Sequence, residues 1–482
     1  MKKTFIEVQK LLLKLSIIFL RCCEILNHSS GVFNYRRIFS ELFRLFYCSE
    51  LFDLKVRSDN DSSDLMAASE AVWLLADWVK TLIKLHYFDE TRHNINNVYN
   101  HSKVIKKFCV MIKIINNTSI ESHRRFLDKS IAILRFSGVL SYDTSATGHL
   151  RIFTIFMRVF SNIIVISYVL TMLADAVVNC NDLMIFVSDG CFIAGWFIAY
   201  SKEAAFYRKR HRFLEFIDNT HRPVDVLRQS TDLALLLDVK ECMLYEAIDY
   251  YLMSLFVIVL GSAIIISSLI LGKLPNRAIF PFDTTIPVYY RLAFFIQAYN
   301  TVYHLIVLVT IDFISWQLMR YTTLQLRVLS FNYINCKGDS LRPVAPDLTR
   351  EYIGALKISS VFSIDDQHKE ICQFAAFEER EMTNISVNFT ERFKTCVKHH
   401  LRLIRVVKDF NDTFSFSLMV QLGGSLLIIC LNGYMVVMFP GDRDNFIRST
   451  AYLLSGFIQL LYWCAFGNQL KFQVSICRYR LN

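Results

Sequence analysis

Long apolar runs separated by polar stretches dominate the chain from about residue 159 onward. Six of these runs approach the ~20 residues that a helix needs to cross the ~30 Å hydrocarbon core of a bilayer. The run at 251–271 contains no charged residue and is the clearest of them. The pattern predicts an all-α fold, a polytopic membrane helical bundle. Its spans are expected at about 159–178, 183–200, 251–271, 292–314, 414–439 and 450–466.

Basic residues are divided unevenly among the segments that join these runs. Segments 201–250 and 317–413 hold eight and fourteen Lys or Arg residues, whereas the turn at 179–182 holds none. Lys and Arg are retained on the cytoplasmic side of membrane proteins. Both basic segments fall on the same side of an alternating topology, and counting back from them predicts a cytoplasmic amino terminus. A G-protein-coupled receptor has the opposite orientation.

Residues 1–120 repeat part of residues 121–225. One set of matches lies at an offset of 114 and a second set lies at 118. Matches at the second offset are Trp78, Lys84 and Phe88, which recur as Trp196, Lys202 and Phe206. Charges interrupt the first copy where a span would lie, and each charge at a bilayer centre costs about 2.5–3.5 kcal/mol. The chain is therefore divided into a partial duplicate at 1–120 and a membrane domain at 121–482. Whether the duplicate crosses the membrane is left open.

Composition agrees with a membrane protein. Hydrophobic residues make up 53% of the chain, charged residues 20%, and mean hydropathy is +0.33. This balance excludes disorder and coiled coil. The thirteen cysteines form no C-x-x-C pair, and the chain contains no P-loop, G-x-S-x-G, H-E-x-x-H or Gly-rich dinucleotide turn. We therefore expect no enzyme, no catalytic residue, no cofactor and no metal site, and the net charge of +10 does not indicate nucleic acid.

Several polar residues near the predicted spans can be interpreted either as functional groups or as ordinary solvated or packed residues. Asp189 lies inside a span and needs a partner if it is buried, whereas Asp312 lies close to a span end and is expected to be solvated at the membrane edge. His399 and His400 with Cys396 resemble metal ligands, but a solvated cytoplasmic helix is favoured because adjacent histidines point about 100° apart. Basic residues in 392–408 resemble a helix that contacts anionic lipid.

Aromatic residues concentrate around the fourth predicted span. They are Tyr289, Tyr290, Phe294, Phe295, Tyr299 and Tyr303. Such a stripe serves packing or an interfacial belt in most membrane helices. Together with Ser267, Ser268 and Gln297 it would also suit a small, largely apolar ligand. The pattern leaves both interpretations open.

Four motifs together resemble the insect odorant receptor family. Segment 274–283 (LPNRAIFPFD) is similar to its second extracellular loop, and Gln325, Leu326 and Leu329 are similar to its cytoplasmic Q-L-x-x-L. Segment 459–468 (QLLYWCAFGN) resembles the signature that ends the sixth span. Its signature residues are Gln459, Tyr462, Cys464, Gly467 and Asn468. Residues Cys396, His400, Phe410 and Phe414 resemble the helix that leads into the fifth span. The resemblance covers about residue 122 to the end of the chain.

The resemblance implies a seven-span, ligand-gated, non-selective cation channel for olfaction. Its implied partners are a small volatile odorant and an olfactory co-receptor in a heterotetramer, in contact with membrane lipid and without nucleic acid. The implied location is the plasma membrane of olfactory sensory neurons, as a multi-pass protein. Residues that fall on the pocket side by position are Ser267, Ser268, Phe294, Tyr299, Tyr452 and Ser455.

The chain departs from the family pattern in three ways. It carries the extra amino-terminal copy, its segment between the fourth and fifth spans is long, and it stops about 15 residues after the signature, before the seventh span. We therefore expect that this chain does not conduct ions alone. The alternatives are a gustatory or G-protein-coupled chemoreceptor, or a pseudogene product that does not conduct. The identity of the odorant and the ion selectivity stay open.

Overall fold

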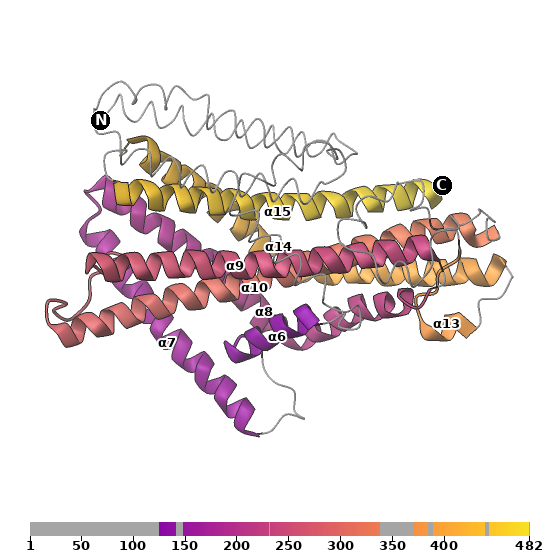
Figure 1. Cartoon of the computed structure of the whole chain (residues 1–482), viewed down its shortest axis with the longest axis horizontal. Helices are drawn as coiled ribbons and strands as arrows, with labels where there is room; N and C mark the ends of the chain where they lie inside the picture. Colours follow the sequence, from indigo (N-terminus) through magenta and orange to yellow (C-terminus); the bar gives the residue numbers. More distant parts are fainter. Residues whose placement is uncertain are drawn as a thin grey trace, which may run out of the picture. The chain divides into compact units, whose positions relative to one another are not determined.

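Nearly all of the described residues are helical. The computed structural model describes residues 125–140, 148–230, 232–337, 371, 373–383, 389–438 and 443–481. The expected duplicate at 1–120 lies outside these residues. Figure 1 shows the helices α6 (Arg125–Phe136), α7 (Gly148–Val178), α8 (Leu183–Leu227), α9 (Leu233–Leu271), α10 (Pro287–Ile334), α13 (Glu379–Thr383), α14 (Phe389–Met438) and α15 (Arg443–Leu481), with the short 3-10 turn η2 (Asn335–Lys337) after α10. No described residue lies in a β-strand, and the prediction of an all-α fold is confirmed.

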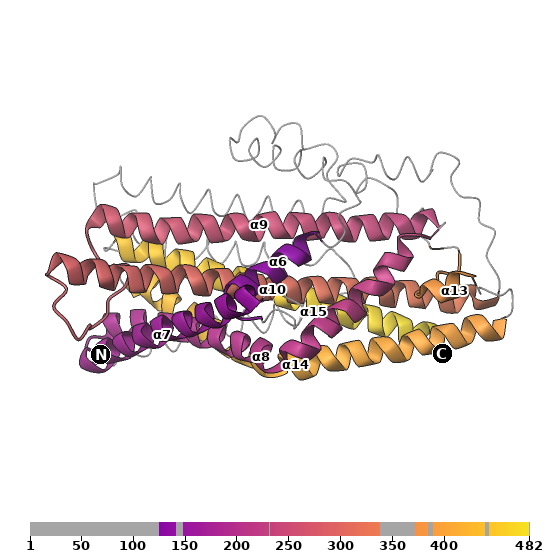
Figure 2. The ribbon, with the colours of Figure 1, turned by 90° about the horizontal axis from the view of Figure 1, so that it is seen from below.

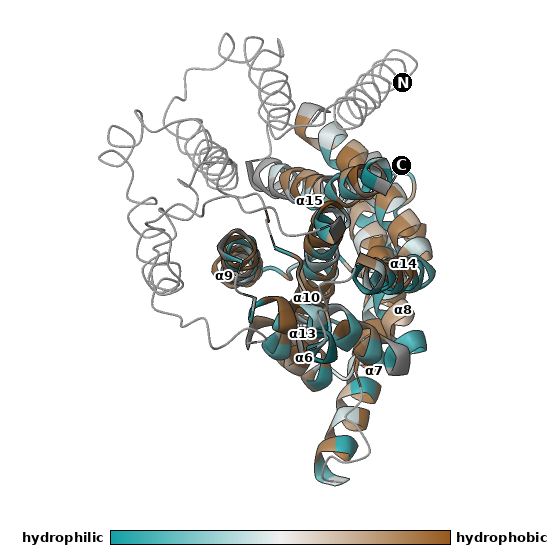
Figure 3. Ribbon diagram, turned by 90° about the vertical axis from the view of Figure 1, so that its right-hand side faces the viewer, coloured by the Kyte–Doolittle hydropathy of each residue, from teal (hydrophilic) through white to brown (hydrophobic). Residues whose placement is uncertain are grey.

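Four of the described helices are long and apolar enough to cross a membrane. These segments are Gly148–Val178, Ala234–Ile270, Pro287–Ile334 and Phe389–Val436. The spans predicted at 183–200 and 450–466 lie inside α8 and α15. In Figure 3 hydrophobic residues, drawn in brown, are spread over the visible faces of the helices. This distribution is typical of helices that face lipid.

The chain divides into two compact units. Among the described residues, the first unit contains Asn181–Ala194 and Leu422–Asn468 apart from 439–442, and the second contains the remainder. Helices α8, α14 and α15 each supply residues to both units.

In the second unit, α9 and α10 lie side by side and antiparallel (Figures 1 and 2). Ionic and hydrogen-bonded pairs that are wholly or partly buried join them. Arg320 Nη2 lies 2.7 Å from Asp249 Oδ2, and Arg327 Nε lies 3.2 Å from Asp238 Oδ2. Between these pairs the Tyr321 hydroxyl donates to the Glu246 carboxylate. The hydropathy pattern treats 201–250 and 317–413 as loops, but these paired charges lie in continuous helix.

Aromatic rings fill the centre of the second unit. Phe206 and Phe213 of α8 lie 4.3 Å apart between ring centroids, and Phe414 of α14 lies 5.3 Å from Phe206. Beside this core, the Lys202 ammonium forms an ion pair with the Asp312 carboxylate, and both side chains are at most 2% exposed. The expectation that Asp312 is solvated at the membrane edge is therefore wrong, because a lysine from α8 compensates its charge inside the protein.

The amino-terminal part of α14 is packed against protein. Cys396 is fully buried with its Sγ 3.7 Å from Cys336 Sγ, and the buried His399 ring stacks on Phe377. The expectation of a solvated helix is therefore wrong for Cys396 and His399, although Lys394 is exposed. Within the described residues no group of His, Cys, Asp or Glu has the geometry to hold a metal ion.

The first unit is built from close contacts between small and branched residues. A Cβ added at Gly456 of α15 would lie 3.4 Å from Ile429 Cγ1 of α14, and one added at Gly190 of α8 would lie 3.4 Å from Leu431 Cδ1. The amide of Asn432 donates to Cys191 Sγ at 3.3 Å. Asp189, in the same stretch of α8, is 2% exposed.

Candidate ligand site

Buried hydrogen bonds hold the loop between α9 and α10 against both α7 and α10. The Asn276 backbone N–H donates to Gln297 Oε1 at 2.9 Å, and Gln297 Nε2 donates to the Asn276 carbonyl at 3.0 Å. The Asn276 side-chain amide donates to the Tyr168 hydroxyl at 2.7 Å. All three residues are buried. One loop residue therefore ties two helices together, and the Gln297 amide is used in holding the loop.

The two ends of this connection are fixed by local backbone chemistry. Gly272 ends α9 in the left-handed region, with φ of 60°, and its N–H lies against the Leu269 carbonyl. Pro287 begins α10, a position where its fixed φ suits the helix and no N–H is needed. Between them, the backbone N–H of Thr285 donates to Asp283 Oδ1 at 2.9 Å. These hydrogen bonds from Thr285 hold the pKa of Asp283 below its usual range.

A second set of contacts joins the loop to the end of α7. The Ile279 N–H donates to the Thr171 carbonyl at 3.3 Å, and Arg277 Nε lies 3.8 Å from Asp175 Oδ2. The Arg277 side chain is largely exposed, so this long pair contributes little. Asp175 also accepts a 2.6 Å hydrogen bond from the Asn179 amide.

An aromatic and hydroxyl cluster lies between α7 and α10, next to the fastened loop. The hydroxyls of Tyr299 and Ser161 are 2.7 Å apart and hydrogen-bonded. The Phe160 ring meets Tyr299 edge-on at 5.3 Å, and Tyr303 stacks on Tyr299 at 5.9 Å. Aromatic faces supply apolar contact area, and the two hydroxyls supply the few polar groups that orient a small ligand.

Two buried polar atoms of α10, one on the residue after Tyr299 and one a turn later, have no hydrogen-bond partner among the described residues. They are Asn300 Oδ1 and His304 Nε2. His304 Nδ1 lies 3.1 Å from the Asn300 carbonyl, and since a carbonyl only accepts, Nδ1 carries the proton and Nε2 is left as an acceptor. Both atoms are therefore acceptors that lack a donor within the described part of the chain. A buried acceptor without a donor costs about 1–3 kcal/mol, and a ligand hydroxyl would remove that cost.

The sequence-predicted pocket residues fall in different surroundings. Ser268 is buried, and its hydroxyl donates to the Ile264 carbonyl of its own helix at 2.8 Å. Phe294 stacks on Tyr290 at 6.4 Å on α10, and Tyr299 belongs to the cluster above. Ser267 lies in α9, and its side chain is outside the described residues.

Tyr452 and Ser455 belong to the first unit. The Tyr452 ring meets Phe192 of α8 edge-on at 5.4 Å, and the Ser455 hydroxyl donates to the Tyr452 carbonyl at 2.9 Å. The motif residues Gln459, Tyr462, Cys464, Gly467 and Asn468 all follow on α15, where Cys464 packs on the buried Ile429, Leu453 and Leu460 cluster. The pocket assignment of all six predicted residues stays a prediction.

Sequence reasoning missed the contribution of α7. Phe160, Ser161 and Tyr168 lie in an apolar run whose hydropathy indicates only a span. A signal was present, because the buried face of α7 carries Ser161, Tyr168, Thr171 and Asp175 at helical spacing. Polar residues on one face of a membrane helix indicate the side turned toward protein.

The comparisons with known proteins agree with this architecture. A sequence profile of the family described as "7tm Odorant receptor" matches residues 183–476, more than half of the chain. The fold is similar to the insect olfactory receptor OR5 from Machilis hrabei, with a TM-score of 0.55 and 13% identity over 73% of this chain and 82% of that one. The same receptor in complex with eugenol gives a TM-score of 0.51 and 12% identity over 71% and 79%. No curated protein matches the chain by sequence.

Proposed function

The chain belongs to the odorant receptor family, and on this premise we propose that it senses a small volatile molecule as a subunit of a ligand-gated, non-selective cation channel. Its proposed partner is an olfactory co-receptor in a heterotetramer. The proposed location is the plasma membrane of olfactory sensory neurons, where the multi-pass chain contacts lipid. No catalytic role is proposed.

The observation that carries this proposal is the aromatic and hydroxyl cluster beside a fastened loop. Tyr299, Ser161 and Phe160 combine apolar faces with a small number of polar groups, as small-molecule sites do. The loop is held by Asn276 and Gln297, so the geometry next to the cluster is fixed before a ligand arrives. Prior ordering of a site lowers the conformational cost of binding.

The unpartnered acceptors define the ligand class more closely. Asn300 Oδ1 and His304 Nε2 favour a largely apolar odorant that carries a hydroxyl, whose single O–H would satisfy one of the two acceptors. The proposed contact residue in this unit is Tyr299, with Phe294 and Ser268 shaping the surrounding surface. Ser267 on α9, and Tyr452 and Ser455 on α15, are proposed as ligand contacts from their positions in the sequence alone.

Currents in cells that express this chain with an olfactory co-receptor test the proposal. A panel of volatile alcohols, phenols and matched hydrocarbons is applied, and dose–response curves are recorded for the native chain, Tyr299→Phe and the exposed control Tyr479→Phe. We expect alcohols or phenols to open the channel. Tyr299→Phe is expected to raise the half-maximal concentration about tenfold, since a hydrogen bond in a buried site is worth about 1–1.5 kcal/mol. Tyr479→Phe leaves the curve unchanged.

Absence of current for every member of the panel, in cells where a direct agonist opens the co-receptor, contradicts the proposal. Equal sensitivity of the native chain and Tyr299→Phe to a hydroxyl-bearing activator removes Tyr299 from the site and leaves the receptor function standing.

A further inference from the structure

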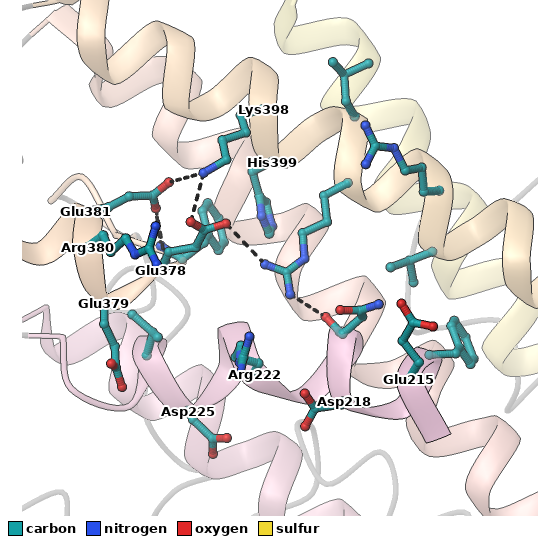
Figure 4. A pocket seen from close by; sticks show the side chains of 18 of the residues that line it. Glu215, Asp218, Arg222, Asp225, Glu378, Glu379, Arg380, Glu381, Lys398 and His399 are labelled. Atoms are coloured by element: carbon teal, nitrogen blue, oxygen red, sulfur yellow. Dashed lines mark hydrogen bonds and ion pairs between the residues drawn. The ribbon is translucent and has the colours of Figure 1, made fainter. Parts of the chain in front are cut away.

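A large charged cavity lies in the second unit, away from the aromatic cluster. It has a volume of about 1070 Å³, opens to the surface, and is lined by α8, α13 with the two residues before it, and α14. Figure 4 shows the side chains that line it. Its ionised residues are the acids Glu215, Asp218, Asp225, Glu378, Glu379, Glu381 and Asp409, and the bases Arg222, Arg380, Lys398, Arg402 and Arg405. The odorant-receptor function proposed above does not use this cavity.

Apart from Arg222 of α8 and Asp409 of α14, the two helices line the cavity with charges of opposite sign. On α14, Lys398, Arg402 and Arg405 follow one another at i, i+4 and i+7, so they share one helix face. On α8, Glu215 and Asp218 are three residues apart and Asp225 follows two turns later on the same face. The cavity therefore has a mainly basic wall and a mainly acidic wall.

The side chain of Arg402 spans the gap between α14 and α8. Pro223 lies inside α8 and has no N–H, so the Asn219 carbonyl four residues earlier loses its helical donor. Arg402 Nη2 reaches across from α14 and donates to that carbonyl at 2.9 Å. The walls are thus one arginine side chain apart at this point. A molecule with a positive and a negative end a few bonds apart would fit between them.

At one end of the cavity the charges are already paired, since Glu378 contacts Lys398 and its Oε1 also lies 3.8 Å from Arg402 Nη1. Lys398 Nζ lies 2.9 Å from Glu378 Oε2, and this hydrogen bond holds the pKa of Glu378 below its usual range. Glu381 accepts the backbone N–H groups of Phe377 and Glu378. The wall charges nearest the other end, Arg405 and Glu215, are exposed and lie outside this set of contacts.

A buried polar atom also belongs to this cavity and finds no partner in the part of the chain that the structure describes. It is Nε2 of His399, a residue that is 4% exposed and whose ring stacks on Phe377 at 3.4 Å between centroids. His399 and Phe377 both line the cavity. A buried imidazole nitrogen left unpaired is costly, and a polar ligand group would satisfy it.

Charge balance selects among ligand classes. A simple anion would face the carboxylates of α8, and a simple organic cation would face the guanidinium groups of α14. A metal ion is not favoured, since no group of His, Cys, Asp or Glu in the described residues has ligand geometry. A zwitterion satisfies both walls at once.

We propose that this cavity binds a phosphate group joined by a two-carbon link to a primary ammonium, the chemistry of phosphoethanolamine. The phosphate oxygens accept from Arg405 and from those N–H groups of Arg402 that the Asn219 carbonyl leaves free, since a guanidinium presents five N–H donors in a planar fork. The ammonium donates its three N–H groups to Glu215 and Asp218. His399 Nε2 supplies a further polar contact.

This chemistry is carried both by a soluble metabolite and by the headgroup of phosphatidylethanolamine. Asp409 at one end of the cavity precedes by five residues the apolar run that begins at Phe414. A lipid headgroup could therefore enter from the membrane surface. The experiment below has a separate arm for each source.

Binding is measured with the full chain purified in a detergent free of phospholipid. Thermal unfolding and titration calorimetry are followed with O-phosphoethanolamine, with inorganic phosphate and with ethanolamine. A parallel arm compares nanodiscs of phosphatidylcholine with and without phosphatidylethanolamine. We expect O-phosphoethanolamine to raise the melting temperature, and the two half-molecules to have no effect at the same concentration. A rise only in the nanodiscs that contain phosphatidylethanolamine identifies the lipid as the source.

Matched variants locate the site. Arg405→Gln and Glu215→Gln each are expected to weaken binding about tenfold, since each removes a charge-assisted hydrogen bond. Lys408→Gln on α14 and Glu391→Gln at its start are exposed controls that do not line the cavity and leave binding unchanged. The proposal is overturned if neither source binds, if inorganic phosphate or ethanolamine alone binds as tightly, or if the cavity variants bind like the controls.

Discussion

At the scale of single residues, buried charges in the second unit are matched by specific opposite charges. Lys202 and Asp312 come from different helices, are nearly inaccessible to solvent and form an ion pair. Such a pair is not strongly stabilising as a whole, because both groups lose hydration. Its members are nevertheless interdependent, since either one alone would be an uncompensated buried charge.

Replacement of one partner is therefore expected to be far more damaging than replacement of both. Lys202→Met should lower the free energy of unfolding by about 3–5 kcal/mol, whereas Lys202→Met combined with Asp312→Leu should recover most of that loss. Thermal unfolding of the solubilised protein, followed by the tryptophan signal, measures the difference. Exposed Lys394→Met is the control. A single variant as stable as the native chain would show that Asp312 is hydrated in the folded protein.

At the scale of helices, the predicted spans fall inside observed helices, but hydropathy did not predict the helix lengths. The predicted span 292–314 lies in Pro287–Ile334, and 251–271 lies in Leu233–Leu271. The extra turns carry Asp249, Arg320 and their neighbours, which a hydropathy pattern counts as loop because it scores each residue alone. Asp249 and Arg320 can be buried in the longer helices because each one contacts an opposite charge on the neighbouring helix, which a one-dimensional pattern does not show.

The sequence predicted some residues of the candidate site but not their roles. The aromatic stripe of α10 was visible in the sequence, and Tyr299 lies in the observed cluster. Gln297 was predicted as a possible ligand contact, yet its amide holds the Asn276 backbone. Which face of a helix meets its neighbour depends on helix rotation, and apolar runs without strong periodicity do not define it.

The hydrogen bonds of Asn276 and Gln297 predict how much each residue stabilises the α9–α10 loop. Asn276→Ala removes the donor to Tyr168, and Gln297→Ala leaves the Asn276 N–H and carbonyl without partners. We expect the second change to cost more, about 1–3 kcal/mol for each buried group left unpaired. Hydrogen exchange of loop amides measures local opening, with exposed Thr285→Ala as a comparison. Equal protection in Gln297→Ala and the native chain would show that the loop is held by other contacts.

At the scale of the whole molecule, the chain buries an apolar core and also exposes large aliphatic faces, which a soluble protein does not. On α7 the buried face carries Ser161, Tyr168 and Asp175, whereas Ile163, Leu170 and Val177 are exposed. A face of exposed aliphatic side chains at helical spacing, on a helix long enough to cross a bilayer, is typical of contact with lipid. The basic segments predict which end of the bundle faces the cytoplasm.

This orientation predicts which cysteines a membrane-impermeant maleimide can reach in intact cells. Cys180 is exposed in the turn between α7 and α8, a turn without basic residues, so it should react from outside. Cys180→Ser should remove that labelling, and Asp283→Cys in the exposed α9–α10 loop should restore it. Lys408→Cys, on the basic part of α14, should react only after the membrane is permeabilised. Labelling of Lys408→Cys in intact cells, with Cys180 and Asp283→Cys protected, would reverse the topology and place the ligand cluster near the cytoplasmic side.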